Sequence, residues 1–152
     1  MEQILYGAPV AKQLDEISLK IFQEVKSNNK TPHMTAITVG DNPASLLYVS
    51  RKKEKAEELG VEFNWIKLDK NTSQEKLKEL VETESKNTDG LIIQLPLPDH
   101  LSSEDVINCI PPDVDVDGLT SYNLGGLFSN EYKLIPATSL AVLELLNFYQ
   151  IK

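Results

Sequence analysis

A short apolar run, Leu91–Ile93, constrains the possible folds of this chain more than any other segment. A run that is apolar throughout is typical of a strand that is covered on both faces of a parallel sheet. Two further strands are predicted at Thr35–Val39 and Val61–Leu68, and segments with helical periodicity separate the three. Helices that alternate with strands predict an α/β fold, a three-layer αβα sandwich with a mostly parallel sheet. No linker or internal repeat interrupts residues 1–152, so we expect one domain.

The sequence also predicts six helices with recognisable start and stop signals. The first is the clearest, since its apolar residues recur at spacings of three and four, which is typical of an amphipathic helix. Thr72–Glu75 has the pattern of a capping box and would start the third helix at Ser73. The predicted ranges are Ala8 or Pro9 to before Ser27, Pro43–Leu59, a segment from Ser73, a short helix after Ser102, Tyr122–Phe128 and Ser139–Tyr149. The apolar face of the first helix consists of Val10, Leu14, Ile17, Ile21 and Val25.

The stretch Gly40–Lys52 joins the first strand to the second helix. Asn42 suits the N-cap, and Pro43 suits the first helical position, where a missing N–H costs nothing. The helix then presents three polar groups on one face, near the carboxyl end of a strand, where open α/β sheets bind ligands. These residues are Ser45, Tyr48 and Lys52. A solvated helix face with an amphipathic Tyr and a long Lys fits the same spacing.

Two loops could extend such a site. Gln94 leaves a buried strand at the same sheet edge, although an amide at this place can also serve only to tie down loop backbone. Asp117 precedes Gly118, so its carboxylate can approach a ligand closely and suits a planar pair of donors, unless it is a solvated turn residue. The run Asp113–Gly118 opens like a calcium loop, but Leu124 stands where a bidentate Glu is needed, so we expect no metal site.

Composition excludes several classes of partner. The net charge of -8 disfavours nucleic acid and anionic membranes, and no apolar run is long enough to span a bilayer. Cys109 is the only cysteine, which excludes an intrachain disulfide. The N-terminus lacks the basic and apolar regions of a signal peptide, so we expect a cytoplasmic protein. No G-x-G-x-x-G or P-loop pattern occurs, so no nucleotide-binding site is recognisable.

Three groups of residues resemble the N-terminal, folate-binding domain of the bifunctional methylenetetrahydrofolate dehydrogenase/methenyltetrahydrofolate cyclohydrolase family. They are Val39–Ser45 followed by Tyr48-x-x-x-Lys52, Asp89–Pro98, and Asp115–Leu119 followed by Asn123 and Gly125. The groups occur in order, and the resemblance covers essentially the whole chain. It implies a role in one-carbon metabolism and purine biosynthesis, with tetrahydrofolate derivatives as substrates and NADP as the cofactor of full-length family members.

The resemblance also implies roles for single residues. Lys52 would be the catalytic base, Tyr48 would stack on the folate rings, and Gln94 would help to set the state of Lys52. Asp117 would bind the amino-pyrimidine edge of the pterin. The remaining predicted substrate-site residues are Ser45, Leu95 and Pro96. We therefore expect Lys52 to be partly buried beside Tyr48 and Gln94.

The chain also departs from the family pattern. Pro136–Ala141 stands where the family has Pro-Cys-Thr-Pro-x-Gly, and the family's NADP-binding Rossmann domain has no counterpart in residues 1–152. We therefore expect a folate site without a cofactor site, no dehydrogenase step from this chain alone, and a monomer, although the family is homodimeric. The leading prediction is methenyltetrahydrofolate cyclohydrolase chemistry. The alternative is a non-catalytic folate-binding or partner-binding domain that has lost turnover.

Overall fold

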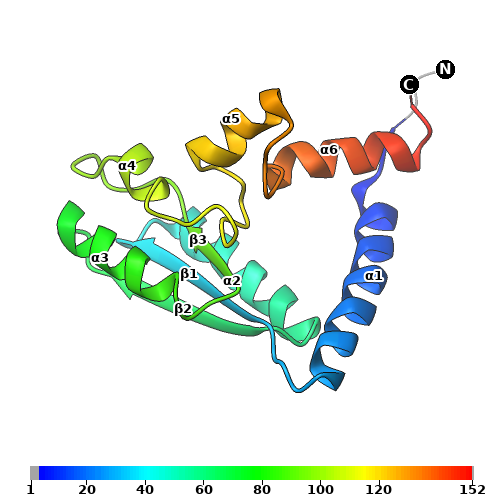
Figure 1. Cartoon of the computed structure of the whole chain (residues 1–152), viewed down its shortest axis with the longest axis horizontal. Helices are drawn as coiled ribbons and strands as arrows, with labels where there is room; N and C mark the ends of the chain where they lie inside the picture. Colours follow the sequence, from blue (N-terminus) through cyan, green and yellow to red (C-terminus); the bar gives the residue numbers. More distant parts are fainter. Residues whose placement is uncertain (1–3, 152) are drawn as a thin grey trace.

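The computed structural model describes residues 4–151, in which three parallel strands form a sheet in the order β2-β1-β3 (Figure 1). The strands are β1 (His33–Val39), β2 (Glu62–Leu68) and β3 (Gly90–Ile93). The helices are α1 (Gly7–Ser27), α2 (Pro43–Glu58), α3 (Gln74–Glu84), α4 (Ser103–Ile107), α5 (Ser121–Ser129) and α6 (Ala137–Phe148). The predicted α/β fold is confirmed. Residues 1–3, on which the expected lack of a signal peptide partly rests, lie outside the described range.

Helices cover both faces of the sheet and produce its three layers. On one face, Ile37 of β1 and Ile93 of β3 belong to a core that also contains Leu77 of α3 and Val106 of α4. On the other face, β1 and β3 contribute Ala36 and Ile92 to a second core with Val49 of α2. All four residues of β3 are buried, as predicted from its apolar run. Burial of each large aliphatic side chain contributes about 1.5–3 kcal/mol, so these two cores hold the sheet and its helices together.

Several element boundaries differ by one or two residues from those predicted. β1 begins at His33 rather than Thr35, because its pairing with β2 continues to that residue. The capping box predicted at Thr72–Glu75 is wrong, since the N-cap of α3 is Ser73 and its Oγ accepts a hydrogen bond from the N–H of Lys76 at 3.3 Å. Lys76 therefore occupies the third helical position, and a lysine cannot accept the reciprocal bond that closes a capping box.

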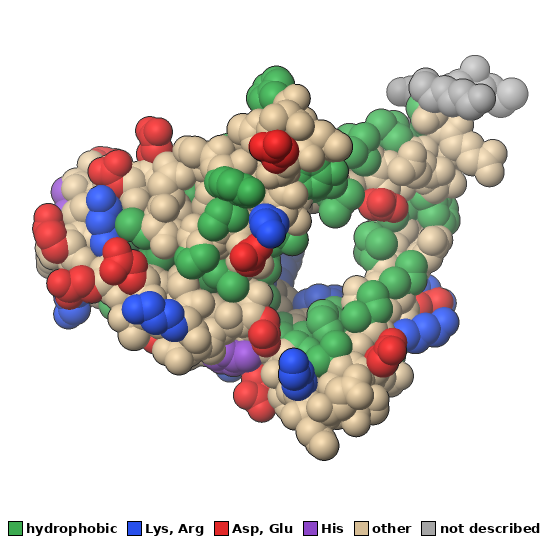
Figure 2. Space-filling view, viewed as in Figure 1, with side chains coloured by type: hydrophobic (Ala, Val, Ile, Leu, Met, Phe, Trp, Pro, Cys, Tyr) green, Lys and Arg blue, Asp and Glu red, His purple; other side chains and the backbone are tan. Residues whose placement is uncertain are grey.

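The apolar face of α1 is largely exposed, which differs from the packing that its periodicity predicts. Val10 is the only buried residue of α1, and Ile17 is 46% exposed. No residue of α6 is buried either. The two helices contact each other, and the Tyr149 hydroxyl bonds to the backbone N–H and oxygen of Tyr6. Figure 2 shows an open space between this helix pair and the sheet layers, with hydrophobic side chains of α1 beside it.

None of the helices in the described range is long and apolar enough to cross a membrane.

Candidate active site

The first turn of α2 is anchored at the carboxyl end of β1. Gly40 turns the chain with a φ of 82°, a conformation that favours glycine. Asn42 Oδ1 then accepts hydrogen bonds from the N–H groups of Ala44 at 3.0 Å and Ser45 at 3.1 Å. The predicted N-cap is therefore confirmed, with Pro43 as the first helical residue. This anchor determines where the following turns of α2 present their side chains.

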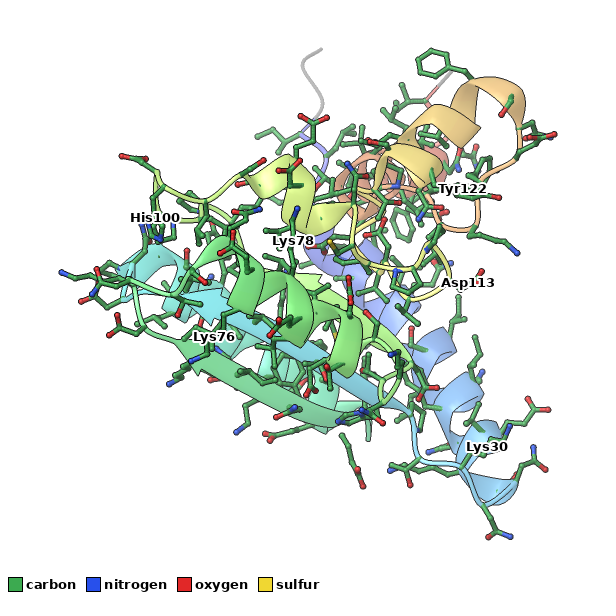
Figure 3. All side chains as sticks on the ribbon, turned by 60° about the vertical axis from the view of Figure 1, so that its left-hand side comes forward. Lys30, Lys76, Lys78, His100, Asp113 and Tyr122 are labelled. Atoms are coloured by element: carbon green, nitrogen blue, oxygen red, sulfur yellow. The ribbon has the colours of Figure 1, made fainter. Side chains whose placement is uncertain are left out.

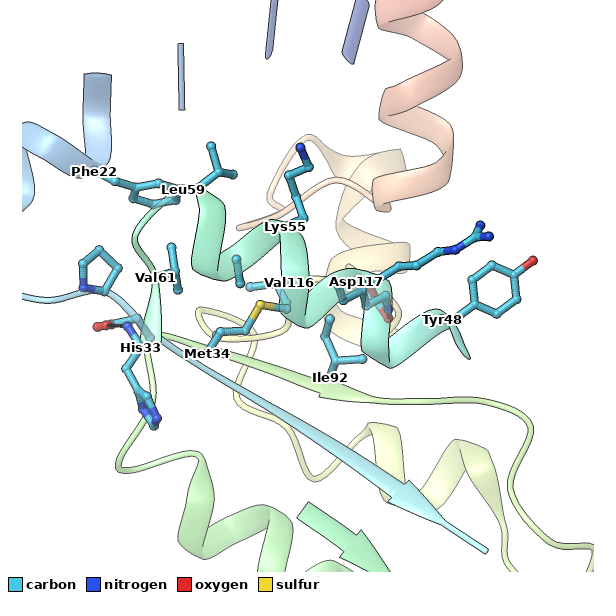
Figure 4. Close-up of a pocket in the computed structure, with 16 residues that line it drawn as sticks. Phe22, His33, Met34, Tyr48, Lys55, Leu59, Val61, Ile92, Val116 and Asp117 are labelled. Atoms are coloured by element: carbon cyan, nitrogen blue, oxygen red, sulfur yellow. Dashed lines mark hydrogen bonds and ion pairs between the residues drawn. The ribbon is translucent and has the colours of Figure 1, made fainter. Parts of the chain in front are cut away.

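Two of the predicted residues of α2, Tyr48 and Lys52, line a cavity of about 590 Å³ (Figure 4). Tyr48 is 59% exposed and lies at one end of the cavity, whereas Phe22 of α1 lies at the other. Ser45 is buried and does not line the cavity. Much of the lining between the two ends is apolar and includes Met34, Leu59, Val61, Ile92 and Val116. The cavity can therefore accept a largely apolar ligand beside Lys52.

The fold brings Lys52 to Asp117, which lies far from it in the sequence and lines the same cavity. Lys52 Nζ and Asp117 Oδ2 are 3.6 Å apart, and the two side chains are 34% and 30% exposed. An ion pair that is this accessible to water contributes only about 0–1 kcal/mol to stability. A ligand that offers either group a better partner can therefore separate the pair at little cost.

A buried carboxylate, Asp115, holds the loop that carries Asp117. Asp115 is 1% exposed and accepts hydrogen bonds from the N–H groups of Leu119 at 3.2 Å and Thr120 at 2.8 Å. It also accepts a hydrogen bond from Asn123 Nδ2 at 3.0 Å. The two acids of this loop therefore differ in what they do. Asp115 uses its oxygens to hold the backbone, whereas Asp117 directs its carboxylate to the cavity.

Asn123 and Gly118 hold this loop against the segment that precedes α6. Asn123 is buried, and its Oδ1 accepts hydrogen bonds from the N–H groups of Lys133 at 3.0 Å and Leu134 at 3.1 Å. Gly118 has a φ of 67°, and a Cβ at this position would lie 2.7 Å from the nitrogen of Pro136. The sequence marks Asp115 and Asn123 only as positions of the family motif and indicates no contact for either residue. No local pattern reveals their contacts, because the partners come from separate segments.

The loop that follows β3 carries the remaining predicted residues. Ser45 Oγ donates a hydrogen bond to the backbone oxygen of Leu95 at 3.4 Å, which joins α2 to this loop. Gln94 Nε2 donates to the same oxygen at 2.8 Å. Gln94 Oε1 is buried and has no hydrogen-bond partner among the described residues. The cavity is not lined by Ser45, Gln94, Leu95 or the exposed Pro96.

The expected association of Lys52 with Gln94 does not appear among the hydrogen bonds of residues 4–151. Lys52 is half-buried, and its ammonium pairs with Asp117 instead. A carboxylate is a stronger partner for an ammonium than an amide oxygen, which explains this choice in the present structure. The predicted residues thus form two groups. Tyr48, Lys52 and Asp117 line the cavity. Gln94, Leu95 and Pro96 follow β3, and Ser45 of α2 bonds to that loop.

The histidines and the acidic loop do not form a metal centre in the described part of the chain. No group of three or more His, Cys, Asp or Glu side chains in residues 4–151 could hold a metal ion. A ring nitrogen of His33 and one of His100 each lie within hydrogen-bond distance of a backbone oxygen, at 2.9 and 3.0 Å. His100 and Asp113 lie on opposite sides of the view in Figure 3, and His33 lies at the opposite end of the cavity from Tyr48 (Figure 4).

The amino-acid sequence is similar to those of folate enzymes. Residues 5–117 match the family described as tetrahydrofolate dehydrogenase/cyclohydrolase, catalytic domain. The chain is 38% identical to the bifunctional protein FolD of Bacillus pumilus over 146 residues, which cover 95% of this chain and 52% of that protein. It is 37% identical to the bifunctional protein FolD of Legionella pneumophila over 138 residues, which cover 90% of this chain and 49% of that protein. The chain therefore spans about half the length of the curated relatives it matches.

Solved structures agree with this similarity. The bifunctional enzyme FolD of Campylobacter jejuni, a methylenetetrahydrofolate dehydrogenase/cyclohydrolase, superposes with a TM-score of 0.94 and 34% identity over 98% of this chain and 54% of that chain. The Trypanosoma brucei methylenetetrahydrofolate dehydrogenase-cyclohydrolase, which was solved with NADP and an inhibitor, gives a TM-score of 0.90 and 27% identity over 99% of this chain and 53% of that chain.

Proposed function

Because this chain belongs to the tetrahydrofolate dehydrogenase/cyclohydrolase family, through the catalytic domain of that family, we propose that it binds a tetrahydrofolate and hydrolyses its methenyl form. The observation that carries the proposal is the pairing of Lys52 with Asp117, 3.6 Å apart, beside a cavity that Tyr48 also lines. A carboxylate can hold the ligand by its donors, and an amine can accept a proton from water. These are the two tasks that binding and hydrolysis require.

Asp117 would hold the amino-pyrimidine edge of the pterin. That edge presents N–H donors in one plane, which suit the two oxygens of a carboxylate. The buried Asp115 supports this role, because its three hydrogen bonds hold the loop in place before a ligand arrives. Tyr48 offers a largely exposed aromatic face, which attracts a flat cationic ring system.

Lys52 would accept the proton that hydrolysis releases. Water adds to the carbon of the cationic methenyl bridge, and a proton must leave the water oxygen as the new C–O bond forms. The hydroxyl proton of this adduct then moves to a bridge nitrogen as the C–N bond to that nitrogen breaks, which leaves a formyl group and an N–H group on the folate. The proton can pass to Lys52 Nζ only when that nitrogen is a neutral amine.

Ligand binding would itself favour the neutral amine. In this structure Lys52 Nζ lies 3.6 Å from Asp117 Oδ2. A pterin that binds Asp117 would withdraw this carboxylate, and the cationic bridge would oppose a second positive charge nearby. The substrate would therefore release Lys52 as a base at the place where the reacting water must lie.

Gln94 would supply a further polar contact. Its buried Oε1 lacks a partner among the described residues, and an unpaired buried acceptor costs about 1–3 kcal/mol. An N–H group of the ligand, or of Lys52 once it leaves Asp117, would remove this cost. Ser45 would position the site rather than react, since its hydroxyl ties α2 to the backbone of Leu95. Leu95 and Pro96, which do not line the cavity, would contact the substrate beyond it, at the carboxyl end of β3.

We do not propose the dehydrogenase step of the full-length relatives for the 152-residue chain by itself. The Trypanosoma brucei relative was solved with NADP, but this chain spans about half the length of its curated relatives, and its sequence has no dinucleotide-binding fingerprint. A cytoplasmic location and a monomeric state are likewise expectations from the sequence.

A non-catalytic folate-binding or partner-binding domain is the second candidate. The exposure of the site favours it, because Tyr48 is largely exposed and both Lys52 and Asp117 are about one-third exposed. Exclusion of bulk water strengthens the electrostatic contacts of an active site, so an accessible site can bind a ligand and still react slowly.

The test follows the absorbance of 5,10-methenyltetrahydrofolate with the purified chain, with Lys52→Met and with Lys53→Met. Lys53 is a matched control, since it is the next residue of α2, pairs with Glu57 at 3.7 Å and does not line the cavity. We expect the unchanged chain and Lys53→Met to hydrolyse the compound faster than it hydrolyses without protein. Lys52→Met should lose this acceleration but still bind the folate in calorimetry, because Met retains most of the side-chain stem.

Hydrolysis by Lys52→Met at the unchanged rate would contradict the role of Lys52. Folate binding without accelerated hydrolysis by the unchanged chain would favour the second candidate.

A further inference from the structure

Three cationic side chains line the cavity, and they differ in their acidic partners. Lys52 pairs with the carboxylate of Asp117 at 3.6 Å. Lys55 pairs with Glu58 at 2.7 Å and with Asp15 at 3.0 Å, and hydrogen bonds to these two carboxylates raise the pKa of its ammonium. Arg51 forms no ion pair within the described range 4–151. Its guanidinium is therefore available to a ligand.

Arg51 lines the cavity together with Tyr48, one turn away on α2. It follows Tyr48 by three residues on α2, so the two side chains are neighbours on the helix surface. A helical side chain covers the turn that precedes its own Cα, and this directs Arg51 toward the turn that carries Tyr48. Both residues are exposed and line the cavity, and Figure 4 shows Tyr48 at one end of it. A ligand that extends past Tyr48 therefore meets the guanidinium.

We propose that Arg51 binds the carboxylates of the glutamyl tail of a folate, an assignment that rests on the proposed function. A tetrahydrofolate consists of a pterin, an aminobenzoyl ring and one or more glutamates, each of which adds a carboxylate. With the pterin edge at Asp117 and the reactive carbon near Lys52, the tail extends along the exposed side of α2. A guanidinium presents a planar fork of N–H donors, which holds a carboxylate by two parallel hydrogen bonds.

The charge of the whole chain makes a local cation important for such a tail. The net charge of -8 repels a polyanionic ligand at long range. At physiological salt this repulsion is screened over about 8 Å, whereas a direct contact with a guanidinium keeps its strength. Lys55 has two acidic partners, and Lys52 faces the reacting carbon in the proposed function, so Arg51 is the cation of the described cavity that an added carboxylate can use.

The test measures by calorimetry the binding of three ligands to the 152-residue chain. They are the monoglutamate and the pentaglutamate of 5,10-methenyltetrahydrofolate, and tetrahydropterin, which has no tail. The variants are Arg51→Gln, Arg51→Lys and the control Lys53→Gln, which removes a neighbouring cation that does not line the cavity. Melting temperatures of all variants verify that the fold is retained.

We expect the unchanged chain to prefer the pentaglutamate to the monoglutamate. Arg51→Gln should bind the pentaglutamate about tenfold more weakly, because a charge-assisted contact is lost, and should bind tetrahydropterin as before. Arg51→Lys should recover part of the loss, since it restores the charge without the fork. Lys53→Gln should match the unchanged chain.

A preference for the pentaglutamate that survives in Arg51→Gln, or that is missing from the unchanged chain, would overturn the assignment of Arg51. If the unchanged chain binds none of the three ligands, the proposed function fails together with it.

Discussion

Lys52 and Asp117 contact each other in this structure, although the proposed chemistry requires a different partner for each. The amine has to face the reacting water, and the carboxylate has to face the pterin. Both side chains are about one-third exposed, so the ion pair is weak enough for a ligand to replace. Substitution of Asp117 should therefore affect the affinity for the ligand much more than the stability of the fold.

Asp117→Asn should weaken the binding of methenyltetrahydrofolate by about thirtyfold, because an amide cannot supply the charge that the pterin donors require. Loss of one partner from a desolvated charge pair costs about 2–5 kcal/mol, and the low end applies to a carboxylate that is 30% exposed. Calorimetry measures the affinity. Asp113→Asn is the control, since Asp113 is exposed and pairs with Lys133 at 3.4 Å. Equal affinities of the unchanged chain and Asp117→Asn would refute the assignment.

Asp115→Ala should instead lower the free energy of unfolding, by about 3 kcal/mol or more. Three hydrogen bonds to its buried carboxylate are lost, and hydrogen bonds to charged groups contribute about 1.5–3 kcal/mol each. Urea denaturation measures the change, and Asp113→Ala should stay within about 0.5 kcal/mol of the unchanged chain. An unchanged urea midpoint for Asp115→Ala would show that this carboxylate does not hold the loop.

At the scale of whole elements, five of the six described helices differ sharply in how much they bury. α2, α3 and α4 contribute buried side chains to the two cores of the sheet. By contrast, α1 has a single buried residue, α6 has none, and the two helices contact each other (Figure 1). The periodicity of α1 predicted the helix correctly, but its apolar face packs against little in the described range.

Ile17→Lys should change the free energy of unfolding by no more than about 0.5 kcal/mol, because Ile17 is 46% exposed and lysine is a good helix former. Ile37→Ala is the matched contrast from the sheet core and should cost about 2–5 kcal/mol. Thermal and urea unfolding measure both changes. If Ile17→Lys destabilised the protein as much as Ile37→Ala, α1 would have to pack against the core in solution.

At the scale of the whole molecule, the described fold corresponds to about half of each related structure. Hydride transfer requires a site that orients the nicotinamide against the folate, and this orientation is a large part of the catalysis. The sequence contains no G-x-G-x-x-G fingerprint for a dinucleotide. In our proposal this chain supplies the folate site.

The purified 152-residue chain should produce no reduced cofactor from methylenetetrahydrofolate and NADP or NAD. The absorbance of the reduced nicotinamide measures the reaction, with the methylenetetrahydrofolate dehydrogenase/cyclohydrolase FolD of Campylobacter jejuni as the positive control. Steady formation of reduced cofactor in proportion to the amount of protein, and its loss in Lys52→Met, would show that the chain carries out the dehydrogenase step by itself.

The sequence by itself determined the features that depend on neighbours along the chain. The apolar run of β3 predicted a strand buried on both faces, and Asn42 and Pro43 predicted the start of α2. Helical spacing placed Tyr48 and Lys52 on one flank of α2. Turn chemistry and similarity to the family motif indicated Asp117 as a candidate ligand-binding residue. Such features are predictable because caps, periodicity and turns involve residues within a few positions of one another.

Only the tertiary structure decided which of these groups meet. It pairs Lys52 with Asp117 rather than with Gln94. It also shows that the carboxylate of Asp115 accepts hydrogen bonds that hold the loop. It also left the apolar face of α1 largely exposed, although the periodicity of that helix is the same as that of a packed helix. Contacts of this kind join residues far apart in the sequence. They depend on which faces the other elements cover, and no local pattern carries that information.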